Sequence, residues 1–79
     1  MIPVERYTQT TAKHFGYWIF IKPNRRIDRA SKKNFINTIE KTLGPIGYKW
    51  QYQAADDRYI LKLDSEQDAV FFLLKFKEN

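Results

Sequence analysis

The chain has 79 residues, no cysteine and a net charge of +5. This length allows one domain and excludes two, and the lack of cysteine excludes a disulfide scaffold, a thiolate nucleophile and a cysteine-based zinc site. No apolar run reaches the ~18 residues of a membrane span, and the first ten residues lack the apolar core of a signal peptide. We therefore expect a cytoplasmic protein, in the host cytoplasm if the chain is viral.

The first sixteen residues are polar and weakly patterned, so residues 1–16 predict either a loosely attached arm or an edge strand. Residues 17–79 predict a single α+β domain. The run Tyr17–Ile21 is β-branched and aromatic throughout, which is typical of a central strand that is apolar on both faces. Pro23 ends this strand because proline cannot donate to a strand ladder.

The excess positive charge is local. Residues 22–33 contain six basic residues and one acid, whereas the rest of the chain carries eight basic and eight acidic residues. We call this stretch the basic segment, and its cations are Lys22, Arg25, Arg26, Arg29, Lys32 and Lys33. A concentrated charge of this kind attracts phosphates or an acidic protein surface.

A helix is predicted next, with Asp28 or Ser31 as its N-cap and Gly44-Pro45 as its end. Its apolar stripe at helical spacing comprises Phe35, Ile36, Ile39 and Leu43. The cations of the basic segment fall in its first two turns, where the helix dipole disfavours each by about 0.3–1 kcal/mol. This conflict indicates a binding function, against the alternative of a solvated helix start kept basic for solubility.

Residues 48–54 alternate aromatic with polar side chains, and residues 58–63 alternate again after a short turn. The two runs predict an antiparallel hairpin. Asp56 and Asp57 in the turn are interpreted as turn formers rather than metal ligands.

The last helix is predicted to start at an Asp64 or Ser65 cap, with acids in its first turn and lysines near its end. Its apolar residues cover more than one face, so a single sheet cannot bury them all. Phe71 and Leu74 are the expected remainder, and they predict either an interface or burial under the N-terminal segment.

The expected fold is therefore α+β, with the order β-α-β-β-α of a ferredoxin-like half. Two helices would cover one face of a three-stranded, mostly antiparallel sheet, to which the N-terminal segment could add an edge strand.

The sheet face turned away from the helices is predicted to carry Trp18, Phe20, Lys49 and Lys62. Aromatic rings among lysines on an open sheet are how RRM-type domains stack unpaired bases, but the RNP1 signature is missing. The alternative is that residues 1–16 or a second subunit cover Trp18 and Phe20.

No catalytic constellation is apparent in the sequence. His14 is the single histidine and has no carboxylate or cysteine beside it in sequence, so we interpret it as a surface or turn residue. The sequence predicts no enzyme, no cofactor and no metal site.

The stretch 63–76 runs from a strand through an acidic cap and Asp-Ala into a Phe-x-Leu-basic-aromatic ending, and 43–50 contains a Gly-x-x-Gly-x-x-Trp turn. Both resemble short phage-encoded accessory proteins. The resemblance implies a viral accessory protein that acts on a host factor.

The leading hypothesis is a binding module that contacts a host protein with an acidic surface, through the basic segment and the apolar surface of the last helix. The alternatives are a single-stranded RNA or DNA binder that uses the same cations and the sheet aromatics, and a homodimeric viral structural or assembly component. No membrane partner is expected.

Overall fold

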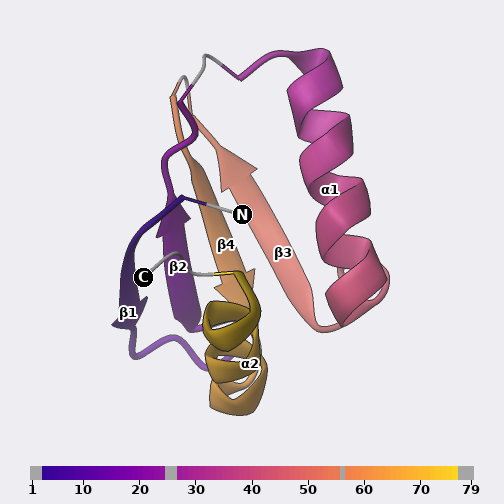
Figure 1. The fold of residues 1–79 in the computed structure, drawn as a ribbon. Coiled ribbons are helices and arrows are strands. Elements are labelled where there is room, and N and C mark those ends of the chain that lie inside the picture. The colour runs from indigo at the N-terminus through magenta and orange to yellow at the C-terminus, as the bar shows by residue number, and fades with distance from the viewer. Residues whose placement is uncertain (1–2, 25–26, 56, 77–79) are drawn as a thin grey trace.

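A computed structural model describes residues 3–24, 27–55 and 57–76. Within these ranges the elements are β1 (Val4–Gln9), β2 (Tyr17–Ile21), α1 (Arg29–Leu43), β3 (Trp50–Ala54), β4 (Tyr59–Leu63) and α2 (Glu66–Phe76). The four strands form one antiparallel sheet in the order β1-β2-β4-β3. Both helices lie on the same face of this sheet (Figure 1). The predicted α+β class is confirmed.

The sheet is built around a split β-α-β unit. Strands β2 and β3, which α1 connects, both pair antiparallel with β4 and therefore run parallel to each other on either side of it. β2 and β4 are the two central strands, and the central position of β2 is the one that the apolar composition of Tyr17–Ile21 predicts. The chain thus returns through the hairpin β3–β4 to fill the gap that the helical crossover leaves.

The N-terminal segment forms an edge strand, the second of its two predicted conformations. β1 pairs antiparallel with β2, with a register irregularity between Val4 and Arg6. The side-chain amide of Gln9 also donates to a carboxylate oxygen of Glu66 at 3.1 Å, which links β1 to α2. The sheet therefore has four strands, one more than the three that the sequence pattern defines.

The core lies between the sheet and the two helices. Ile19, Ile21, Trp50, Leu61 and Leu63 are buried on the helix-covered face of the strands. The helices cover them with buried side chains at Ile39, Leu43, Ala69 and Phe72. Large aromatic side chains join α1 to the sheet: the Phe35 ring stacks on Tyr59 with centroids 4.0 Å apart and planes 4° apart.

The strand β3 begins two residues later than the alternating pattern predicts. Gly47 adopts φ 90°, a left-handed conformation that glycine tolerates, and its amide donates to the Trp50 carbonyl at 2.8 Å. Tyr48 and Lys49 therefore lie in a turn, and the Tyr48 side chain is 75% exposed. The predicted alternation of side chains holds for Trp50–Ala54, whereas Tyr48 and Lys49 belong to the turn.

The loop between β1 and β2 is held closed at its base. The Thr10 amide donates to the Gly16 carbonyl at 2.8 Å, and the Phe15 amide donates to an Asp64 carboxylate oxygen at 2.9 Å. The Asp64 carboxylate accepts this bond from the loop. The cap of α2 is Ser65, whose hydroxyl accepts from the Asp68 amide at 3.1 Å.

Gly16→Ala is expected to destabilise the domain by about 1–3 kcal/mol, the usual effect of adding atoms to a filled site. A Cβ at this position would lie 2.7 Å from the backbone carbonyl oxygen of Ala12, which cannot move aside as a flexible side chain would. Urea unfolding followed by circular dichroism measures the change. An unchanged urea midpoint would contradict the close approach of the Ala12 carbonyl oxygen to Gly16.

Candidate binding surface

Four cations of the basic segment lie directly after β2 or in the first turns of α1. Lys22 follows β2 directly, and Arg29, Lys32 and Lys33 are exposed side chains of α1. Arg25 and Arg26 lie outside the described residues. The structure therefore shows four of the six predicted cations as exposed residues, three of them at the start of α1, which is at the top of Figure 1.

The start of α1 is capped by one carboxylate, that of Asp28. Its Oδ1 accepts from the Ser31 amide at 2.7 Å, so the first of the two predicted caps is the correct one. This bond, together with the Ser31 hydroxyl, lowers the pKa of Asp28 because the hydrogen bonds stabilise the charged form.

Asp28→Ala is expected to destabilise the domain at neutral pH and to have little effect at acid pH. Because the pKa of Asp28 is lower in the folded chain than in the unfolded chain, its contribution is present above the unfolded pKa of about 3.9. The contribution is lost as the pH falls through the folded value. Urea unfolding of both proteins across this range measures the difference, and a gap that stayed constant down to acid pH would contradict the capping role.

The cations at the start of α1 have no acidic partner within the described part of the chain. The ion pairs among the described residues lie elsewhere in the molecule. They join Arg58 to Glu5 and to Asp57, each at 3.2 Å, and His14 to Asp64 at 3.8 Å. The first turn of α1 contains no acidic residue, whereas that of α2 contains Glu66 and Asp68. The positive charge of Arg29, Lys32 and Lys33 is therefore available to an external anion.

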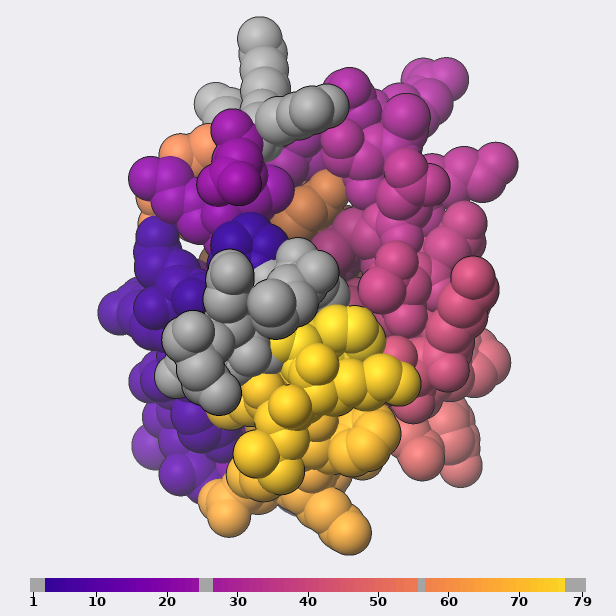
Figure 2. All heavy atoms as spheres, in the orientation of Figure 1, coloured from indigo at the N-terminus to yellow at the C-terminus, as the bar shows by residue number. Residues whose placement is uncertain are grey.

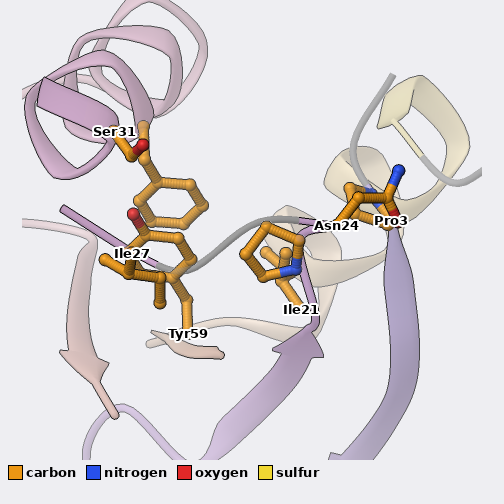
Figure 3. Close-up of a pocket in the computed structure, with 8 residues that line it drawn as sticks. Pro3, Ile21, Asn24, Ile27, Ser31 and Tyr59 are labelled. Atoms are coloured by element: carbon orange, nitrogen blue, oxygen red, sulfur yellow. The ribbon is translucent and has the colours of Figure 1, made fainter. Parts of the chain in front are cut away.

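A pocket of about 310 Å³ opens beside the same end of α1. We call it the α1 pocket. Its walls come from the chain before β1, the end of β2 and the loop that follows, and from α1 and β4. The lining residues are Pro3, Ile21, Pro23, Asn24, Ile27, Ser31, Phe35 and Tyr59. Figure 3 shows Tyr59 and Ile27 on one side and Pro3 and Asn24 on the other, and Figure 2 shows the surface hollowed between the loop and α1.

One wall of the α1 pocket is rigid and contains an unused hydroxyl. Tyr59 is 3% exposed and is packed between Phe35 and Tyr52. Its buried hydroxyl has no hydrogen-bond partner among the described residues. Burial, and to a smaller extent neighbouring Tyr52 and Asp28, raise the pKa of Tyr59, so the hydroxyl is neutral at physiological pH and can donate a hydrogen bond.

The outer face of the sheet carries the predicted aromatic residues, but cations of the same chain already contact their rings. The Arg6 guanidinium carbon lies 4.1 Å from the Phe20 ring centroid, and the Lys62 ammonium lies 4.6 Å from the Trp18 ring centroid. Phe20 is only 9% exposed. Cover by the N-terminal segment, one of the two predicted arrangements, is therefore found for Phe20, while Trp18 remains half-buried.

The last helix exposes apolar side chains on the same side of the molecule as α1. Leu74 is 81% exposed and Phe71 is 48% exposed, so the N-terminal segment does not bury them. Val70, which the sequence pattern did not single out, is also exposed. These three residues form the α2 patch, on the helix whose yellow end faces the viewer in Figure 2.

The other candidate polar residues, His14 and Asp57, lie apart from the α1 pocket lining. His14 is 72% exposed in the loop between β1 and β2, and Asp57 pairs with the adjacent Arg58; Asp56 is not among the residues that the structure describes. Nowhere in residues 3–24, 27–55 and 57–76 do three histidine, aspartate or glutamate side chains gather as a metal site would need. Neither described helix combines the length and the apolar character that crossing a membrane requires.

The α1 pocket is the feature that sequence reasoning missed. Its walls come from segments far apart in the chain, so no local pattern marks it. The one available signal was Ile27, an apolar residue among the cations of the basic segment. Comparison with family models, with curated proteins and with solved structures finds no match to this chain.

Proposed function

We propose that this domain is a non-enzymatic binding module that recognises an acidic surface of another protein through the basic segment. The observation that carries the proposal is the exposed cluster Arg29, Lys32 and Lys33 at the start of α1, unpaired within the described residues and opposed to the helix dipole. The chain is able to place acids at a helix start, as α2 does. A cluster that lowers stability is consistent with selection for contact.

The α2 patch supplies a second contact in this proposal. Interfaces combine an apolar centre with a polar rim, and exposed apolar patches on small domains mark contact sites. Both helices lie on the same face of the sheet, with the start of α1 at the top of Figure 1 and α2 towards its bottom, so a partner that contacts both surfaces has to span this face. A host protein as partner is supported by the resemblance of residues 43–50 and 63–76 to phage accessory proteins.

The proposal is tested with a fluorescent synthetic peptide of aspartates and glutamates around one central tryptophan, which we call the tryptophan probe. Anisotropy titrations at low and at physiological salt should show binding that weakens as salt screens the charges. A single-stranded DNA of matched charge serves as the competitor. Binding of the DNA but not of the probe at physiological salt would contradict the proposal.

A single-stranded nucleic acid is the second candidate ligand, and the half-exposed Trp18 beside Lys62 favours it. The cover over Phe20 argues against it, because a base stacks only on a free ring. Nucleic-acid binding predicts that affinity falls by about 0.7 log units per neutralised phosphate for each log unit of salt, and that Trp18 fluorescence is quenched. An unquenched Trp18 at saturating DNA would exclude stacking on this face.

The α2 patch also favours a third candidate, a homodimer or assembly contact through Phe71 and Leu74. Sedimentation at high concentration distinguishes it, because Leu74→Asp should dissociate such a dimer with little change in stability. A monomer at high micromolar concentration would remove this candidate.

A further inference from the structure

We propose that the α1 pocket holds one aromatic or large aliphatic side chain of the acidic partner, so that the partner is recognised by an apolar anchor flanked by carboxylates. This inference rests on the proposed function and adds to it the chemistry of the partner. It begins from the position of the pocket, which takes four of its eight lining residues (Pro23, Asn24, Ile27 and Ser31) from the basic segment.

Apolar and basic residues are interleaved along this stretch. Lys22 lies between Ile21 and Pro23, which both line the pocket, and Lys32 follows the lining residue Ser31. The lining itself contains no lysine or arginine, so a ligand that fills the pocket lies beside the basic segment. The complementary ligand has an apolar group with negative charge next to it.

The size and walls of the pocket fit one large side chain. A volume of about 310 Å³ is at the lower end of the 300–1,000 Å³ usual for ligand sites, which suits a single ring rather than an extended ligand. Its walls are ring and aliphatic groups, with Tyr59 held in place by its stack with Phe35. A prearranged apolar site of this kind accepts an anchor without reordering its own side chains.

The few polar groups of the pocket also suit a peptide. Asn24 is exposed at the loop and can bond the backbone of an incoming chain. The Tyr59 hydroxyl is buried without a partner in the described part of the chain, so Tyr59 contributes the face of its ring to the pocket wall.

The test compares the tryptophan probe with an alanine probe, identical except for alanine at the central position. The intact chain should bind the tryptophan probe about ten- to a hundredfold more tightly, the ratio expected for burial of one large apolar side chain. The methyl NMR signals of Ile21 and Ile27 should shift when the tryptophan probe is added and should not shift when the alanine probe is added.

A blocking variant and its control locate the anchor. Ser31→Leu places a larger side chain in the pocket and should bring the affinity ratio of the two probes close to one. Asn37→Leu adds the same side chain at an exposed position of α1 outside the pocket and should leave the ratio unchanged.

The outcomes separate this inference from the proposed function. Equal, salt-sensitive binding of both probes to the intact chain would overturn the pocket inference and leave recognition of acidic surfaces standing. A tighter tryptophan probe whose advantage survives Ser31→Leu and which leaves Ile27 unperturbed would also overturn it. Failure of both probes to bind would overturn the proposed function and the inference together.

Discussion

Trp50→Ala is expected to leave the domain largely unfolded at physiological temperature. The Trp50 side chain has no solvent exposure and belongs to the buried core cluster between the sheet and the helices. Replacing a buried tryptophan with alanine costs about 3–5 kcal/mol, which is comparable to the whole stability of a small domain, about 5 kcal/mol at the lower end of the usual range. Circular dichroism and urea unfolding measure the loss.

Two further variants separate the causes of this loss. Trp50→Phe keeps most of the apolar volume but removes the bond from the indole Nε1 to the Gly44 carbonyl at 2.9 Å, and it is expected to lose about 1–2 kcal/mol. Tyr48→Ala in the preceding turn should stay within about 0.5 kcal/mol of the parent, because its side chain is 75% exposed. A Trp50→Ala protein as stable as the Tyr48→Ala protein would contradict the packing described here.

The double substitution Arg29→Glu with Lys32→Glu, which reverses two charges, is expected to make the domain more stable. It is also expected to weaken binding of the tryptophan probe. Both positions lie at the start of α1, where the helix dipole favours acids. The free energy of unfolding should rise by about 0.5–1 kcal/mol at low salt, and the gain should shrink as salt screens the charges. Urea unfolding at two salt concentrations measures it.

A matched control keeps the net charge the same. Lys13→Glu with Lys49→Glu reverses two exposed lysines outside the basic segment and should leave both stability and probe affinity near the parent values. If the Arg29/Lys32 variant were no more stable than this control, the proposed conflict between binding and helix stability would have no energetic basis.

The regular parts of the fold were predictable because their side chains follow a period. The two-sided apolar run in β2 marked a central strand, and the stripe ending at Leu43, with a cap at Asp28 or Ser31, marked α1; the structure assigns the cap to Asp28. Strand β1 was ambiguous because its side chains are mostly polar and its register is irregular after Val4. It forms a strand because pairing with β2 satisfies its backbone, which no local pattern encodes.

The candidate surfaces were predictable only where exposure follows from sequence alone. The cations of α1 and the surplus apolar residues Phe71 and Leu74 are exposed, as charge and periodicity indicated. The contact of Arg6 with Phe20 depends on cross-strand register. The α1 pocket depends on the fold bringing Pro3 and Tyr59, which are far apart in sequence, to the same site. Both are tertiary features, so they appear only once the sheet order is known.

The affinity of the tryptophan probe for the Arg29/Lys32 variant, relative to the Lys13/Lys49 variant, tests the central claim most directly. Because the two proteins have the same net charge, a difference in affinity reports the location of the charge. We predict that the Arg29/Lys32 variant binds at least about tenfold more weakly, equivalent to about 1.4 kcal/mol, while the Lys13/Lys49 variant binds like the parent. Equal affinity of the two variants would contradict the claim that the basic segment is the binding surface.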